Sequence, residues 1–254
     1  MKLKFLGSGT SQGVPVIGCH CAVCRSGDPR DSRTRSSALI TTDQNKKILI
    51  DCGPDFRMQM LSNGEDHIDA VLLTHEHNDH VIGLDDLRPL IFKNDKEMPL
   101  YCAERVGKEV RKRFSYAFAA EKYPGAPSFQ LREIEGDFRL LDAEVTPVSV
   151  MHHWLPILGF KFKNLAYITD ASLIPAEEIP KLRNLDYLIL NCIRKENEHP
   201  AHFILPQILE IYRELKPKKM YLTHLSHHIG KHEITEAELP AGVHLAYDGL
   251  ELEF

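Results

Sequence analysis

Four metal-binding side chains fall within six consecutive residues of this chain. His75, His77, Asp79 and His80 form the pattern H-x-H-x-D-H, and three neutral imidazoles with one carboxylate suit zinc, iron or manganese. The preceding run DAVLLT is apolar and β-branched, which is typical of a buried strand, and the following HVIGLDDLRPLIF has the apolar spacing of a helix. The ligands are therefore expected at the carboxyl end of a strand, where open α/β sheets build their sites.

This pattern resembles the signature of the metallo-β-lactamase superfamily. The resemblance implies three further ligands in the order His, Asp, His, and the candidates are His152, Asp170 and His224, because each follows an apolar run of strand character. The family arrangement also implies two divalent metals, zinc or manganese. The implied ligand sets are His75, His77 and His152 for one metal, Asp79, His80 and His224 for the other, and Asp170 as the bridge.

Length and composition fit one compact domain spanning residues 1–254, and the resemblance implies that this domain is a hydrolase. Hydrophobic residues make up 43% of the chain and charged residues 26%, both ordinary for a soluble globular protein. No apolar run is long enough for a membrane span, and the N-terminus MKLKFLGSGT lacks a secretory apolar segment, so we predict a cytoplasmic protein with no membrane contact. The net charge of -5 disfavours a nucleic-acid partner, which requires a basic face.

The hydrophobic periodicity predicts many short strands with helices between groups of them. The predicted strands are Lys2–Leu6, Ser37–Thr42, Lys47–Asp51, Ala70–Thr74, Leu100–Ala103, Phe129–Glu133, Glu144–Val150, Ile157–Phe162, Ala166–Thr169, Tyr187–Asn191, Met220–Thr223 and His244–Tyr247. The predicted helices are Asp55–Ser62, Val81–Phe92, Arg105–Phe118, Ala176–Leu182 and Leu205–Leu215. Together with the family resemblance, this order predicts an α/β fold, the four-layer αββα sandwich of the metallo-β-lactamase type.

A second cluster of ligand types lies near the N-terminus. Cys19, Cys21 and Cys24 have the spacing C-x-C-x2-C, which can place three thiolates on one tetrahedral zinc and leaves one position for a ligand from elsewhere. His227 is the preferred fourth ligand, with His228 and His20 as alternatives. This second feature resembles the PhnP-like phosphodiesterase branch of the superfamily, in which a Cys3His zinc holds a loop beside the active site. Three free thiols in a glycine-rich loop are the alternative interpretation.

Three further residues are assigned supporting or catalytic roles. In the resembling phosphodiesterases and in tRNase Z enzymes, a His that binds no metal protonates the leaving group, and His202 occupies that place better than His199. Asp79 is expected to serve catalysis as well as metal binding. Asp51 matches an early Asp of the family, and the resemblance implies that it supports the ligand loop by hydrogen bonds behind the metals; a turn residue at the end of a strand is the alternative.

Arginines between residues 30 and 35 admit two interpretations. Arg30, Arg33 and Arg35 could contact a phosphate at the mouth of the site, but a solvated loop is the preferred interpretation. Cys52, Cys102 and Cys192 lie in apolar runs and are expected to be small core residues.

The implied reaction is hydrolysis of a small phosphodiester, cyclic or linear, by a metal-bridging hydroxide with His202 as the general acid. Asp170 in the bridging position disfavours a true β-lactamase, because those enzymes commonly place a Cys on the second metal. Two alternatives stay open: an RNA-processing nuclease like tRNase Z, for which no long basic arm is visible, and a non-catalytic metal-binding protein on the same fold. The expected partner is a small-molecule phosphodiester, and a homodimer is left open.

Overall fold

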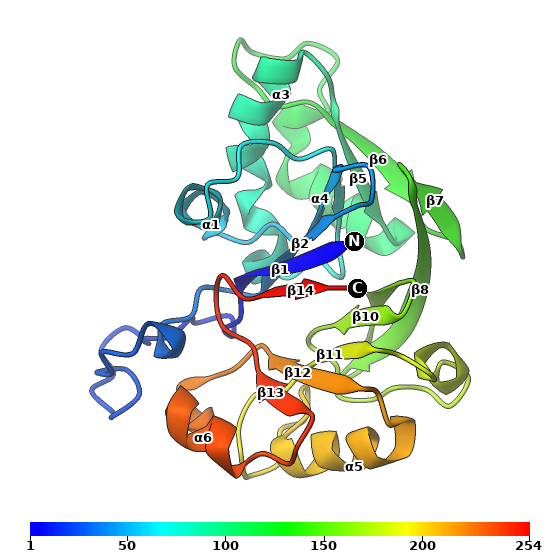
Figure 1. The fold of residues 1–254 in the computed structure, drawn as a ribbon. Helices are drawn as coiled ribbons and strands as arrows, with labels where there is room; N and C mark the ends of the chain where they lie inside the picture. Colours follow the sequence, from blue (N-terminus) through cyan, green and yellow to red (C-terminus); the bar gives the residue numbers. More distant parts are fainter.

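The computed structural model describes all 254 residues, which form two seven-stranded sheets packed against each other (Figure 1). In order across the first sheet, the strands are β14 (Glu251–Glu253), β1 (Lys2–Gly7), β2 (Ser37–Thr41), β3 (Lys47–Ile50), β4 (Ala70–Leu72), β5 (Met98–Cys102) and β6 (Phe129–Glu133). In order across the second, they are β13 (Val243–Leu245), β12 (Lys219–Thr223), β11 (Tyr187–Asn191), β10 (Leu165–Ile168), β9 (Leu155–Phe162), β8 (Ala143–His152) and β7 (Phe138–Leu140).

Both sheets are mixed. On one side of each sheet the neighbouring strands are parallel, and helical or loop crossovers connect them. In the first sheet β3, β4, β5 and β6 are parallel neighbours, and in the second β10, β11, β12 and β13 are. The α-helices are α1 (Phe56–Ser62), α2 (Asn78–Val81), α3 (Arg88–Asn94), α4 (Glu104–Arg113), α5 (Leu205–Leu215) and α6 (His232–Glu238). The 3-10 helices are η1 (Pro29–Asp31), η2 (Ile82–Leu87), η3 (Ser115–Ala117), η4 (Ile179–Leu182) and η5 (His227–Ile229). None of the helices is long and apolar enough to cross a bilayer.

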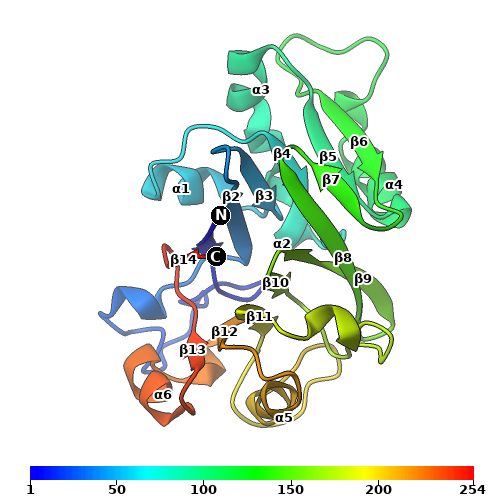
Figure 2. The ribbon, with the colours of Figure 1, turned by 45° about the vertical axis from the view of Figure 1, so that its right-hand side comes forward.

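Apolar residues on both faces of each sheet explain the layered packing. In β3, Ile48 and Ile50 face the core between the sheets, whereas Leu49 joins the core under α1, η2, α3 and α4. In β10, Tyr167 faces the central core and Ile168 faces the helical layer that contains α5. Because successive side chains of a strand alternate in direction, continuous apolar runs bury two faces at once. Figures 1 and 2 show the resulting αββα sandwich, as predicted.

Three predicted helices differ from the structure. The predicted helix Arg105–Phe118 corresponds to α4, which ends at Arg113, and to the separate short η3. The predicted helix Val81–Phe92 is divided into the end of α2, η2 and α3, because the Gly83 N–H donates to the Cys52 carbonyl at 2.9 Å rather than within a helix. A side chain at Gly83 would collide with the Gly53 carbonyl, so this close approach also requires glycine. The predicted helix Ala176–Leu182 is reduced to the short η4.

The elements that the pattern missed include two short strands and one helix. Strands β7 and β14 contain charged residues and only three positions each, and α6 follows directly on the His-rich segment around residue 227. In elements of this length, periodicity carries little information, and pairing with a neighbouring strand determines the structure. Strand β14 forms because β1 pairs with it, from Lys2 opposite Glu253 to Lys4 opposite Glu251.

The two sheets meet beside the H-x-H-x-D-H motif. The Leu158 N–H of β9 donates to the carbonyl of Thr74, which follows β4, at 3.1 Å. The ends of β3, β4, β8, β10 and β12 therefore converge on one edge of the sandwich, and each of these ends leads into a predicted ligand or supporting residue.

Candidate metal centre

The first predicted ligand group forms where β4 and β8 end. His75, His77 and His152 each present a ring nitrogen, and these atoms lie within 4.8 Å of one another. His75 is fully buried, and its Nε2 lies 3.1 Å from His77 Nδ1. His152 Nδ1 lies 2.9 Å from the Ala201 carbonyl. Donation to that carbonyl fixes the ring and leaves Nε2 as the free ligand atom.

The second predicted group converges on Asp170. His80 Nε2 lies 3.2 Å from Asp79 Oδ2 and 3.4 Å from Asp170 Oδ2, and His224 Nδ1 lies 2.9 Å from Asp170 Oδ1. His80 Nε2 is buried and makes no hydrogen bond, so these distances describe donor atoms gathered around a common point. A buried nitrogen without a partner is costly unless an ion or a water occupies that point, which fits a metal at this position.

Asp170 touches both groups, because its Oδ2 also lies 3.9 Å from His75 Nε2 of the first group. Its two oxygens are therefore shared between imidazoles of the two sets. This is the arrangement expected of a bridging carboxylate, and the donor set of imidazoles and carboxylates fits divalent zinc or manganese.

The charges in the cluster favour a cation. Burial opposes ionisation of Asp170, but the neighbouring His224 and His80 hold its pKa well below its ordinary value. Burial likewise disfavours a charged His80, yet the carboxylates of Asp170 and Asp51 raise its pKa well above its ordinary value. The pKa of His75 is lowered, first by burial and then by the charge on His80. The site thus combines an imidazole that favours the neutral form, His75, with a position around His80 that attracts positive charge.

Three residues of the centre adopt backbone conformations that side chains disfavour. The φ angles of Asp51, Asp170 and His224 are 61°, 58° and 53°, and each residue follows the end of a strand, β3, β10 or β12. Such left-handed conformations are costly outside glycine and often mark functional sites, where surrounding contacts hold them. The sequence carried no signal for this feature.

Asp51 lies behind the candidate ligands and contacts His80. The buried carboxylate accepts the Thr74 N–H at 2.8 Å and the Thr74 hydroxyl at 2.8 Å, and its Oδ2 lies 2.7 Å from His80 Nδ1. The His80 Nδ1–H donates to it, which leaves Nε2 directed toward Asp170. Ser36, which the sequence analysis missed, lies beside His224, with its Oγ 3.2 Å from Nδ1, the nitrogen that also faces Asp170.

We expect Asp51→Ala to weaken metal binding and activity by about 10- to 100-fold, because His80 would lose the acceptor that orients it. Asp51→Asn should be milder, since an amide oxygen can still accept the Nδ1–H. Metal titration and hydrolysis rates of both variants test this role. Equal metal affinity in the wild type and Asp51→Ala would show that His80 does not depend on this contact.

His202 lies inside the same cluster. Its ring centroid is 4.7 Å from that of His152 and 4.8 Å from that of His224, and a ring nitrogen lies within 4.8 Å of ligand atoms of His152 and Asp170. The Phe203 N–H donates to the Ala171 carbonyl at 2.9 Å, which places this segment beside Asp170. Burial, and then the charge on His224, lower the pKa of His202 to about 2. His199 lies farther out, with its ring 4.8 Å from that of His202.

The cysteine cluster is brought together as the spacing indicated. His227 Nδ1 lies 3.3 Å from Cys19 Sγ, 3.5 Å from Cys21 Sγ and 3.3 Å from Cys24 Sγ. Zinc–sulfur and zinc–nitrogen bonds of ordinary length at a tetrahedral angle separate sulfur from nitrogen by about 3.5 Å, so these four side chains fit one zinc. The two alternative ligands lie outside the group: His228 contacts His227 through Nε2 at 3.0 Å, and His20 is not part of it.

We expect Cys21→Ser to remove one zinc per chain and to lower the melting temperature by about 5 °C or more, because zinc bound there orders the loop. The metals of the main centre should remain. Elemental analysis and thermal unfolding measure the two effects, and Cys102→Ala, which removes a buried thiol outside the cluster, is the control for zinc content. Unchanged zinc content in Cys21→Ser would contradict the assignment.

The interpretation of residues 30–35 as a solvated loop was wrong for Arg33. Its side chain is buried, donates to Ser8 Oγ at 2.9 Å and to the Ala246 carbonyl at 2.5 Å, and lies 3.2 Å from His232 Nδ1. Arg35 pairs with Asp55 at 2.9 Å. These contacts join the loop after β1 to residues near the C-terminus. Local sequence patterns do not predict such long-range contacts.

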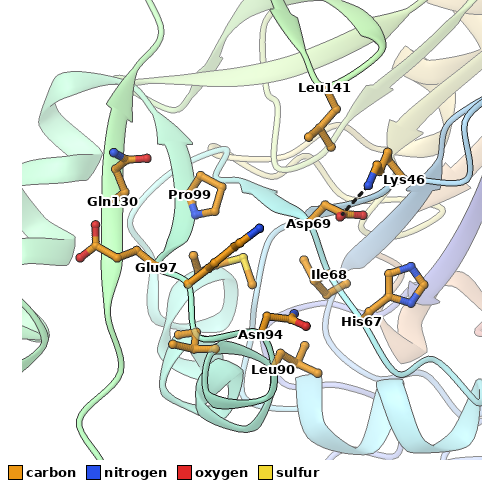
Figure 3. A pocket seen from close by; sticks show the side chains of 13 residues that line it. Lys46, His67, Ile68, Asp69, Leu90, Asn94, Glu97, Pro99, Gln130 and Leu141 are labelled. Atoms are coloured by element: carbon orange, nitrogen blue, oxygen red, sulfur yellow. Dashed lines mark ion pairs between the residues drawn. The ribbon is translucent and has the colours of Figure 1, made fainter.

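A cavity of about 640 Å³ lies away from the candidate centre (Figure 3). Its lining includes residues just before or at the start of β4 and β5, such as Asp69 and Met98, whereas the ligands follow the opposite ends of the strands. Lys46 and Asp69 pair across it at 3.6 Å, and no group of metal-binding side chains lines it. Volume alone therefore does not identify the functional site in this chain.

Residues 46–225 match the family model described as the beta-lactamase superfamily domain. The chain belongs to the metallo-β-lactamase superfamily. A solved structure described as a new diphosphatase from the PhnP family is 42% identical, with a TM-score of 0.92 over 100% of this chain and 97% of the other. These matches confirm the superfamily and the fold that the motif predicted, and the PhnP-family likeness agrees with the branch inferred from the cysteine cluster.

Two further proteins are similar to this chain. Zn(2+)-bound PqqB from Methylobacterium extorquens has a TM-score of 0.80 over the whole of both chains at 22% identity, which shows a shared fold. A Porphyromonas gingivalis protein named octanoyltransferase is 47% identical over 253 residues, covering 99% of this chain and 51% of that protein. The chain thus spans about half the length of this curated relative.

Proposed function

We propose that this chain is a metal-dependent hydrolase that cleaves a small phosphodiester, cyclic or linear, at a dinuclear centre. The observation that carries the proposal is Asp170, whose oxygens approach imidazoles of both ligand groups. The first metal would be held by His75, His77 and His152, and the second by Asp79, His80 and His224, with Asp170 shared. Such ions lower the pKa of bound water and stabilise negative charge on phosphoryl oxygens.

The side chains around the metals have distinct roles in this proposal. Asp51 orients His80, and Asp79 binds a metal while its charge balances His80 next to the reacting group. His202 donates a proton to the departing alkoxide. Burial lowers the pKa of His202, and an anionic phosphate bound beside the ring would raise that pKa and favour the protonated form.

Similarity to the PhnP-family diphosphatase supports phosphate-ester chemistry, and the small polar cluster suits a small substrate. A tRNase Z-like nuclease is the weaker alternative, since the net charge of -5 offers little attraction to an RNA backbone. A non-catalytic metal-binding protein is weaker still, because every ligand position that the family pattern requires is filled. The free thiols Cys52, Cys102 and Cys192 suit a reducing compartment such as the cytoplasm.

A second candidate function is hydrolysis of an octanoyl ester. The observation that favours it is the 47% identity to the protein named octanoyltransferase, although about half of that protein lies outside the match. A dinuclear centre that polarises a phosphoryl oxygen can also polarise a carbonyl oxygen, so the chemistry is feasible. Nothing in the donor set favours a carbonyl over a phosphoryl group.

The two candidates are separated by comparing bis(4-nitrophenyl) phosphate with 4-nitrophenyl octanoate, each with added Mn²⁺ or Zn²⁺. We expect metal-dependent cleavage of the phosphodiester that is absent from chelator-treated protein. Cleavage of the octanoate alone would overturn the proposal in favour of the second candidate. A cyclic phosphodiester compared with a tRNA precursor then distinguishes a small-molecule enzyme from an RNA nuclease.

A further inference from the structure

Glu76 lies between His75 and His77, the first two candidate ligands of the H-x-H-x-D-H motif. Its Oε1 pairs with Nη1 of Arg105, and Nη1 of Arg113 donates to the Glu76 carbonyl. The other carboxylate oxygen is buried and has no hydrogen-bond partner, so Arg105 is the single partner of this side chain. Two contacts from α4 therefore hold the residue that separates the two imidazoles.

Helix α4 is a firm support for these contacts. Val106 and Val110 are fully buried in the core between the first sheet and its helices, which fixes the helix against the sheet. Arg105, Glu109 and Arg113 are four residues apart and so lie along one face of the helix, where Glu109 Oε2 is 3.9 Å from Arg113 Nη2. The motif is thus attached to an element whose position the core determines.

Arg105 also reaches the second sheet. Its Nη2 donates to the Pro156 carbonyl of β9 at 2.6 Å. Pro156 lies opposite Met151 in the pairing of β8 with β9, and the adjacent pair joins Leu155 to His152, the third candidate ligand of the first group. A planar guanidinium presents its N–H groups in a fixed fork, so one arginine can hold both the motif and β9, whereas a lysine ammonium is a single point of contact.

The second ligand group has its own supports. His80 Nδ1 lies 2.7 Å from Asp51, and His224 Nδ1 lies 3.2 Å from Ser36 Oγ. Arg105 bonds to neither of these imidazoles, since its recorded partners are Glu76 and Pro156. Loss of the guanidinium should therefore affect the two groups unequally.

We propose that Arg105 is a positioning residue for the first metal. By holding Glu76 and the Pro156 carbonyl together, it fixes the spacing between the H-x-H segment and the end of β8, and so keeps the three imidazoles of the first group convergent. Removing residues that orient metal ligands typically weakens metal binding by about 10- to 100-fold. The inference rests on the ligand groups of the proposed function and is independent of the substrate.

Zinc retention tests this role without requiring turnover. Purified proteins are equilibrated at graded free-zinc concentrations set by a chelating buffer, and the zinc retained is measured by elemental analysis. We expect Arg105→Gln to require at least about tenfold more free zinc to fill one site of the main centre. Arg105→Lys should give an intermediate value, because an ammonium can keep one of the two contacts.

Arg111→Gln is the matched control and should retain zinc like the wild type. It removes the same charge from the same helix, but its guanidinium lies 4.6 Å from the centroid of the Phe118 ring and contacts no part of the motif. Should Arg105→Gln fail to fold, the comparison of Arg105→Lys with Arg111→Lys decides the question in the same way.

Two further measurements show through which contacts Arg105 acts. The double variant Glu76→Gln/Arg105→Gln should bind zinc about as weakly as Arg105→Gln alone, because both changes remove the same contact. Anomalous diffraction from Arg105→Gln crystals at limiting zinc should show a weakened peak at His75, His77 and His152 and a retained peak at His224.

Unchanged zinc retention in Arg105→Gln, or equal weakening of both main-centre metals, would overturn the proposal and make Arg105 a general stabiliser of the fold. Additive losses in the double variant would overturn the route through Glu76. If the wild type holds only one metal in the main centre and its binding depends on Arg105, the proposed dinuclear function fails and the positioning role stands.

Discussion

Asp170→Asn is expected to lower phosphodiesterase activity by roughly 10³-fold or more and to reduce the metal content of the main centre. The amide keeps the shape of the carboxylate but removes the charge that both ligand groups share. His80 and His224 lie 3.4 and 2.9 Å from the two oxygens, so loss of the anion weakens both metal positions at once. Every substrate should be affected equally, whatever its leaving group.

Asp186→Asn provides the matched control for this variant. Asp186 precedes β11 in the same sheet and pairs with Lys218 at 2.6 Å, at the opposite end of the strand from the centre. Activity and metal content should stay at the wild-type level in this control. A fully metallated and active Asp170→Asn protein would show that Asp170 does not bridge two ions.

His202→Ala should retain both metals of the main centre and slow the hydrolysis of diesters with poor leaving groups by about 10²- to 10⁴-fold. A nitrophenolate leaving group needs little protonation, so the hydrolysis rate of nitrophenyl diesters should fall much less in His202→Ala. The measurement is a series of aryl and alkyl diesters of increasing leaving-group pKa, in which the wild type should show a weaker dependence on that pKa than the variant.

The structure also raises a competing role for His202. A ring nitrogen lies within 4.8 Å of ligand atoms of His152 and Asp170, which is close enough for a metal ligand. Removal of a metal ligand and removal of a proton donor have different consequences. If His202→Ala loses metal and slows substrates with good and poor leaving groups equally, His202 is a metal ligand. His199→Ala is the comparison variant. If it alone shows the dependence on leaving group, the general acid is His199.

The positions of the candidate ligands His75, Asp170 and His224 were predictable because each follows an apolar run. The strands before His75, Asp170 and His224 are buried on both faces, so their sequences are continuous apolar segments whose ends are easy to recognise. Family resemblance then supplied the grouping of ligands, which the pattern alone does not contain. The supporting role of Asp51 was implied by the family resemblance, and in the structure Asp51 reaches His80 because β3 and β4 are parallel neighbours.

Features that depend on distant contacts were not predictable. Arg33 is buried only because Ser8, Ala246 and His232 surround it, and these residues come from opposite ends of the chain. The helix predicted after His80 is broken because Cys52 exchanges backbone hydrogen bonds with His80 and Gly83. The proximity of His202 to His152 and Asp170 depends on the Ala201 carbonyl and the Phe203 N–H, whose partners are remote in sequence.

The most direct test of the dinuclear centre is anomalous diffraction from crystals of the purified protein, recorded above and below the zinc and manganese absorption edges. The account predicts two metal peaks about 3.5–4 Å apart, with Asp170 between them. A third peak, zinc, is expected among Cys19, Cys21, Cys24 and His227. A single peak in the main centre of metal-supplemented crystals, or two peaks that Asp170 does not contact, would contradict it.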